Sequence, residues 1–138
     1  MIEYNKYSRG SEWRIWDLHI HTPGTKKNDQ FTGSNLDEKW ANYIDSINNS
    51  TEEISVIGIT DYFSIENYFK FKELVSKGEI KKDFDLIIPN IELRVLPVTS
   101  SANPINLHCI FNPVIDTEIE SRFQTPRSQS PDWERSRN

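Results

Sequence analysis

Apolar residues recur along the chain at two spacings, which predict strands and helices in alternation. Short runs that are almost wholly apolar, or that alternate apolar and polar residues, predict strands over residues 13–21, 54–60, 85–93 and 105–112. Apolar residues three or four positions apart predict helices over residues 34–48 and 64–78. This order predicts an α/β fold with a parallel sheet, either a barrel or an open sheet. The segment between the third and fourth strands is too short for a complete helix, so we expect an irregular crossover there.

Residues that favour helix ends support the limits of both helices. Ser34 with Asp37, or Asn35 with Glu38, would cap the start of the first helix. Gly78 would stop the second helix. These signals agree with the apolar spacing, so the two helices are predicted from independent observations.

The composition changes near the C-terminal end. Residues 121–138 are rich in Ser, Pro and Arg and are basic overall, whereas residues 1–120 are acidic overall. Because the end of the chain has little apolar surface to offset the entropy of ordering, we predict a disordered tail over residues 118–138. We therefore expect an N-terminal extension (1–12), one α/β domain (13–117) and this tail.

The overall composition excludes several classes of protein. The chain has 138 residues, the size of one ordinary domain, and its net charge of −5 is unlike that of a general nucleic-acid-coating protein. No apolar run approaches the roughly 18 residues that a membrane span needs, and the first residues lack the apolar centre of a signal peptide. The single cysteine, Cys109, excludes an internal disulfide, so we expect a cytoplasmic protein without membrane contact.

Two histidines in the first predicted strand are the first indication of chemistry. His19 and His21 alternate along the strand, which puts both imidazoles on one face, about 6.5–7 Å apart along the strand. Two ring nitrogens at this spacing can converge on one divalent cation. The alternative is that both histidines are satisfied by backbone or carboxylate partners.

Two carboxylates lie at the second and third predicted strands. Asp61 directly follows the apolar strand 54–60, and active sites of parallel sheets gather at such strand ends. Alternatively, Asp61 caps the helix that follows. Glu92 interrupts an otherwise apolar strand, and a carboxylate is costly to bury there unless it is paired or bound to a metal. Its alternative is a surface position at a ragged strand end.

The third histidine lies in the fourth predicted strand. On its own, His108 would more often be a hydrogen-bonded core residue than a ligand, and its neighbour Cys109 is expected to pack in the core. In combination, however, all three histidines of the chain and two carboxylates lie on or just after four successive strands. This donor set suits Zn²⁺, Mn²⁺ or Fe²⁺, and several such ligands at one barrel mouth suit phosphate-ester hydrolysis.

Four segments resemble the first four motifs of the PHP (polymerase and histidinol phosphatase) domain. They are DLHIHT (17–22), ITDYFS (59–64), IIPNIEL (87–93) and NLHCIF (106–111), in the expected order. The segment RGSEWRIWDLHIHTPGT (9–25) is similar to the PHP domain of TrlF-family AAA-like ATPases, which is joined to an ABC/SMC-type ATPase. The resemblance implies that residues 13–117 form the N-terminal portion of a distorted (β/α)7 barrel, incomplete, with about four strands.

The same resemblance implies a metal-dependent phosphoesterase. His19 and His21 would bind a first metal, and Glu92 would bridge it to a second metal held by His108. Asp61 matches the acid of the second motif and, with Glu92, is a candidate for catalysis. One or two Zn²⁺, Mn²⁺ or Fe²⁺ ions are expected, with phosphate esters, including nucleotides or nucleic acids, as substrates.

The sequence also departs from the PHP pattern. Tyr62 stands where a further ligand histidine is usual, no histidine follows His108, and no phosphate-binding P-loop pattern occurs. We therefore expect a truncated chain that lacks the ATPase domain or needs a complementing chain. The alternative is a catalytically inactive remnant or interaction module. A third interpretation, an amidohydrolase-type barrel, shares the paired histidines but fits the later motifs less well.

Overall fold

The computed structural model describes residues 12–25, 29–95 and 104–123. In chain order, the strands and α-helices are β1 (Ile15–Ile20), α1 (Leu36–Asn49), β2 (Ile54–Tyr62), α2 (Glu66–Ser76), β3 (Leu86–Val95), β4 (Ile105–Ile110) and α3 (Asp116–Phe123), and the 3₁₀ helix η2 (Pro113–Ile115) directly precedes α3. Each predicted strand and both predicted helices are present, with limits shifted by a few residues at most. The chain is therefore a mixed α/β protein, as the spacing of apolar residues predicts.

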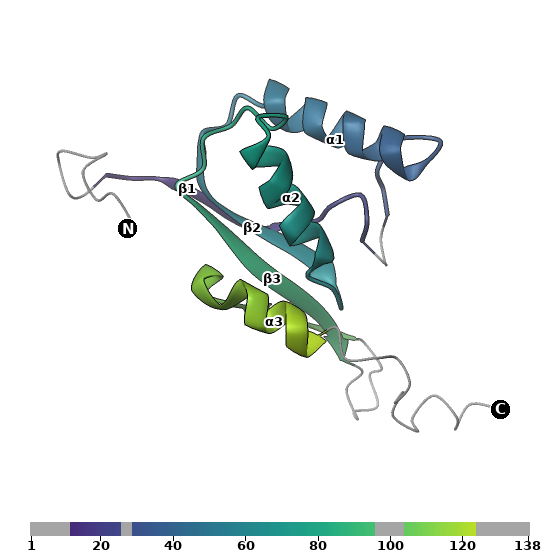
Figure 1. The fold of residues 1–138 in the computed structure, drawn as a ribbon, viewed down its shortest axis with the longest axis vertical. Helices are drawn as coiled ribbons and strands as arrows, with labels where there is room; N and C mark the ends of the chain where they lie inside the picture. The colour runs from purple at the N-terminus through teal and green to yellow at the C-terminus, as the bar shows by residue number, and fades with distance from the viewer. Residues whose placement is uncertain (1–11, 26–28, 96–103, 124–138) are drawn as a thin grey trace.

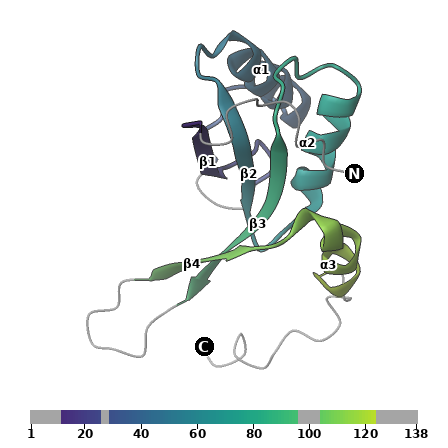
Figure 2. The ribbon, with the colours of Figure 1, turned by 90° about the vertical axis from the view of Figure 1, so that its left-hand side faces the viewer.

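The four strands form one curled sheet in the order β1-β2-β3-β4; β1, β2 and β3 are labelled in Figure 1 and β4 in Figure 2. β1 pairs with β2 and β2 with β3 in parallel, but β4 runs antiparallel to β3. The expected crossover before the fourth strand is therefore wrong. Val95 and Ile105 pair directly across β3 and β4, and a parallel pair would need a connection of about a dozen residues or more.

The three helices lie on the same side of the sheet (Figure 2). Aromatic side chains of α1 and α2, including Trp40, Tyr43 and Phe71, pack there against Ile59 of β2 and Ile91 of β3. Cys109 packs against the same core, as expected. Because successive side chains of a strand alternate between faces, Thr60, Asn90 and Glu92 project to the opposite face, which none of the described helices covers. This uncovered surface is called the open face below.

The start of α1 follows one of the two predicted caps. The side chain of Asn35 accepts a hydrogen bond from the N–H of Glu38 (2.9 Å), and Glu38 Oε2 accepts one from the N–H of Ser34 (2.8 Å). These contacts satisfy two N–H groups that have no partner within the helix. Gly78, which is predicted to stop the second helix, lies just after α2 and adopts a left-handed conformation with φ of 73°.

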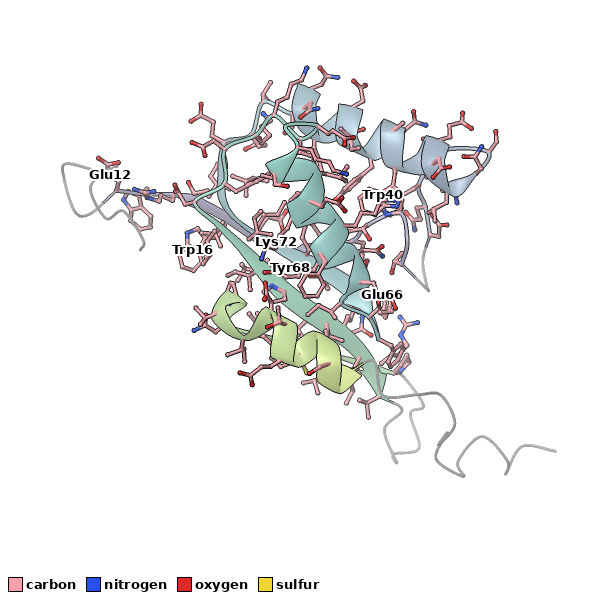
Figure 3. The ribbon with its side chains drawn as sticks, in the orientation of Figure 1. Glu12, Trp16, Trp40, Glu66, Tyr68 and Lys72 are labelled. Atoms are coloured by element: carbon pink, nitrogen blue, oxygen red, sulfur yellow. The ribbon has the colours of Figure 1, made fainter. Side chains whose placement is uncertain are left out.

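The predicted disordered tail begins too early, because residues 118–123 belong to helix α3. Ile119 is only 4% exposed and belongs to the core. Asp116, at the first position of the helix, lies 2.7 Å from Lys72 Nζ and accepts a hydrogen bond from the hydroxyl of Tyr68 (3.2 Å). Both partners project from α2 toward α3 (Figure 3). One buried isoleucine and one anchored carboxylate thus order a segment of low average hydrophobicity.

The other terminal predictions concern residues outside the described part of the chain. The predicted N-terminal extension lies there except for Glu12, as does the predicted tail beyond residue 123. Among the described helices, none has the length and apolar character needed to cross a membrane.

Candidate metal centre

Glu92 is the centre of a polar cluster on the open face. Its side chain is fully buried, and Oε1 has no hydrogen-bond partner among the described residues. Its backbone carbonyl accepts a hydrogen bond from the N–H of Phe63 (3.1 Å), the one described non-glycine residue with a positive φ (55°). A buried carboxylate with an unpartnered oxygen is costly unless a cation or a donor faces it.

The two histidines of the first strand face this carboxylate. His19 Nε2 and His21 Nε2 each lie 3.3 Å from Glu92 Oε2, and they lie 3.2 Å from one another. His19 is half exposed and His21 is one-quarter exposed, so the cluster opens to solvent on the side of His19. The side chains of His19 and His21 therefore lie close together, and Glu92 completes a group that could hold one metal ion.

An irregularity in β1 brings His19 to this position. The pairing of β1 with β2 shifts between Asp17 and Ile20. There the backbone of Leu18 approaches β2 so closely that a Cβ at Gly58 would lie 2.5 Å from the Leu18 carbonyl oxygen. Only glycine leaves room for this approach. Gly58 thus permits the distortion that directs His19 toward β3, two strands away.

The separations of the three atoms suit a metal ion better than direct hydrogen bonds. Charge-assisted N–H···O bonds are shorter, about 2.7–2.9 Å, and two imidazole N–H groups directed at one oxygen would bring their hydrogens together. Three atoms that bind one ion tetrahedrally at about 2.0–2.1 Å are about 3.3–3.4 Å apart. The observed 3.2–3.3 Å is close to this value. Two imidazole nitrogens and one carboxylate oxygen are therefore a fitting donor set for a divalent transition metal.

His108 lies beside this group without joining it. Its ring packs edge-on against that of His19, with centroids 4.5 Å apart, and Glu92 is its pairing partner across β3 and β4. The ligand atoms that lie within 4.8 Å of one another nevertheless belong to His19, His21 and Glu92 alone, among the described residues. Nδ1 of His108 lies 3.2 Å from the side-chain nitrogen of Asn90.

Asp61 is not brought to the group. It projects from the opposite face of β2, because it alternates with Thr60 and Tyr62. Its carboxylate accepts hydrogen bonds from the N–H and hydroxyl of Thr22 (3.1 and 2.6 Å) and from the side chain of Asn67 (2.8 Å). Burial raises the pKa of Asp61, and these hydrogen bonds and the nearby His21 act in the opposite direction. Asp61 therefore holds Thr22, the residue after His21, against α2.

Two further residues complete the surroundings of the site. The ring of Tyr62 stacks on His21, with centroids 5.2 Å apart and planes at 13°, and so restricts its orientation. The guanidinium of Arg94 lies 5.8 Å from the centroid of Tyr62, the ring that stacks on His21, and carries a permanent positive charge. Sequence reasoning missed Arg94, although its position two residues after Glu92 indicates the same face of β3.

Comparison of the chain with models of known protein families found no match. Comparisons with curated proteins and with solved structures found none either. The site is therefore interpreted from its own residues.

Proposed function

We propose that this chain is a PHP-type metal-dependent phosphoesterase domain in which His19, His21 and Glu92 bind one divalent Zn²⁺, Mn²⁺ or Fe²⁺ ion. The observation that carries the proposal is the mutual distance of 3.2–3.3 Å between three ligand atoms around a fully buried carboxylate. The four PHP-like segments, two of which contain these residues, also support it.

The roles of the residues follow from their positions. A bound divalent ion would polarise a phosphoryl group and activate a water molecule. Glu92 would supply the negative charge that retains such an ion, and Tyr62 and Asp61 restrict His21 and the residue after it. His19 lies at the exposed side, where a substrate can approach. Arg94 adds a positive charge that attracts a phosphate ester to an otherwise acidic protein.

Metal binding by purified protein tests this proposal. We expect about one Zn²⁺ or Mn²⁺ ion per chain in calorimetric titration. His19→Ala and Glu92→Gln should lower the affinity by more than the about 10–100-fold that loss of a supporting residue costs. Glu66→Gln, which makes the same chemical change at an exposed position of α2, is the matched control. Equal affinities of the wild type and His19→Ala would contradict the assignment of the site.

Hydrolysis tests the chemistry separately from binding. With Mn²⁺ present, the wild type should cleave a chromogenic phosphate ester, whereas His19→Ala should be inactive. Equal cleavage by both proteins would exclude this site as the source of activity.

A second candidate function, an interaction module without catalysis, is favoured by the apolar edges of the sheet. Ile105, Leu107 and Ile110 of β4 are each at least half exposed, and so is Trp16 of β1. Exposed apolar residues on edge strands are typical of surfaces that another chain covers. This candidate, in which the metal site is incomplete, predicts no hydrolysis, together with self-association or partner binding in light scattering. A compact monomer that cleaves phosphate esters would contradict it.

A further inference from the structure

Asn90 on β3 determines the hydrogen-bonding state of His108. Asn90 is 3% exposed, and its side-chain nitrogen lies 2.9 Å from the Leu18 carbonyl oxygen, 2.9 Å from Thr60 Oγ1 and 3.2 Å from His108 Nδ1. A carbonyl oxygen only accepts hydrogen bonds. The amide nitrogen, and not the amide oxygen, must therefore face Leu18, which defines the orientation of the whole carboxamide.

The two hydrogens of this amide have identifiable acceptors. Leu18 O and Thr60 Oγ1 are 3.1 Å apart and lie at similar distances from the amide nitrogen, so one hydrogen directed between them can be shared as a bifurcated hydrogen bond. The other hydrogen is then available to His108 Nδ1. An amide nitrogen has no lone pair to offer, so a protonated Nδ1 would face a second donor. Nδ1 of His108 therefore accepts a hydrogen bond.

This contact places the proton of the neutral imidazole on Nε2. A histidine that binds a metal through Nε2 needs a lone pair there, so its neutral ring carries the proton on Nδ1. His108 has the reverse arrangement, since the partner of Nδ1 is a donor. Within the described part of the chain, no hydrogen bond to Nε2 is found. His108 is thus poised to donate one hydrogen bond to a molecule outside the chain.

We propose that His108 binds a phosphoryl oxygen of the substrate through Nε2–H and is not a metal ligand. This inference rests on the proposed function and departs from the ligand role that the PHP resemblance implies. The ring centroid of His108 lies 4.5 Å from that of His19. Glu92 is the pairing partner of His108 on β3, and Arg94 lies two residues after Glu92. A phosphate ester held at the metal site would therefore have the Nε2–H of His108 beside it, whereas Arg94, whose Nε donates to Asn106 Oδ1 (3.2 Å), adds a positive charge further along β3.

Nitrogen NMR of protein with ¹⁵N-labelled histidine tests the tautomer directly. The signals of His108 are assigned by their loss in His108→Gln. We expect Nε2–H and an unprotonated Nδ1 in the metal-free protein, and no metal-bound shift at His108 when Zn²⁺ is added. His19 and His21 should show such shifts. A protonated Nδ1, or a zinc-bound Nε2, at His108 would overturn the proposal.

Binding of zinc and of inorganic phosphate tests the role. His108→Ala should bind Zn²⁺ within about twofold of the wild type, but the zinc-loaded variant should bind phosphate about 10–100-fold more weakly, as expected for one hydrogen bond to a charged group. His108→Gln, whose amide can donate, should restore part of the phosphate affinity. A loss of zinc affinity in His108→Ala as large as that in His19→Ala would refute the proposal.

The two proposals fail in different ways. If the wild-type chain binds no divalent metal, the proposed function is contradicted, and the proposed contact of His108 with a substrate is contradicted with it. If the chain binds zinc and His108 proves to be a ligand, the proposed function stands and only this inference is overturned. Asn90→Ala adds a further check, because removal of the donor should allow the Nδ1–H tautomer of His108 to become populated.

Discussion

Glu92 is a fully buried carboxylate that faces imidazole nitrogens and has one oxygen without a partner. Such a group favours metal binding and disfavours folding of the metal-free protein, because an incompletely paired buried charge costs free energy. Residues at functional sites often trade stability in this way. The two effects can be separated by removing the charge and keeping the shape.

Glu92→Gln should therefore be more stable than the wild type without metal. We expect a gain of about 1–2 kcal/mol in the free energy of unfolding when a chelator is present. With saturating Zn²⁺ the order should reverse, because the variant has lost the ligand that binds the ion. Chemical denaturation in both conditions measures this. A variant less stable than the wild type without metal would show that the imidazoles already compensate the charge of Glu92.

At the scale of elements, the contact between β1 and β2 depends on Gly58. A Cβ there would lie 2.5–2.7 Å from backbone atoms of Leu18, too close for either strand to remain in place. Gly58→Ala should cost about 1–3 kcal/mol of stability, as overpacking does. It should also weaken zinc binding, because the displaced strand positions His19.

Gly78→Ala is the control for this substitution. Gly78 has a positive φ of 73°, but no atom lies within 4 Å of a Cβ placed there. It should cost about 1 kcal/mol through the backbone alone and leave the zinc affinity unchanged. Calorimetric titration of both variants provides the comparison. Equal zinc affinities in the wild type and Gly58→Ala would mean that the approach of Leu18 does not orient His19.

The docking of α3 on α2 should depend on pH through Asp116. Burial acts to raise the pKa of its carboxyl, but the hydrogen bond and charge of Lys72, with the hydroxyl of Tyr68, outweigh burial and lower it. Burial is the largest cause that raises the pKa of Tyr68, and the charge of Asp116 adds to it. The Tyr68 hydroxyl therefore keeps its proton and remains available as a donor. A carboxyl whose pKa is lower in the folded state stabilises the fold above its unfolded pKa of about 3.9. That stability is lost as the pH falls through the lower, folded value.

Asp116→Asn tests this dependence. At pH 6 the variant should be less stable than the wild type by about 1 kcal/mol, because Lys72 is partly exposed and solvent weakens the pair. The difference should begin to shrink at about pH 4 and should disappear once the pH has fallen below the lowered pKa of the folded carboxyl, where the wild-type group gains a proton. Free energies of unfolding between pH 2 and pH 6 measure it. A difference that stays constant over this range would assign the anchoring to packing of Ile119 instead.

At the scale of the whole molecule, the candidate site connects two strands that are not hydrogen-bonded neighbours in the sheet. His19 belongs to β1 and Glu92 to β3, with β2 between them. An ion bound by both would therefore resist unfolding of three strands at once. Binding to the native state alone raises stability by about 2.7 kcal/mol at a ligand concentration 100 times the dissociation constant.

Zinc should accordingly raise the unfolding midpoint of the wild type, and a chelator should reverse the change. His21→Ala should show little or no response, whereas the control Glu66→Gln should respond as the wild type does. Thermal unfolding with and without Zn²⁺ measures this. An equal response in His21→Ala would indicate that zinc binds elsewhere on the chain.

The secondary-structure elements that depend on neighbouring residues could be predicted from the sequence. The spacing of apolar residues along strands and helices is a property of neighbouring positions, so the four strands and the first two helices were predicted from it. The direction of β4 and the helical state of residues 118–123 were not. They depend on contacts between distant segments, such as Asp116 with Lys72, that no local window contains.

The amino-acid sequence by itself determined which side chains share a face of each strand, because alternation is a property of the extended backbone. That was enough to pair His19 with His21 and to mark Glu92. Only the tertiary structure decided which faces meet. It turned Asp61 toward α2 and gave His108 a donor partner, because these outcomes depend on helix placement and on the carboxamide of Asn90 between two strands.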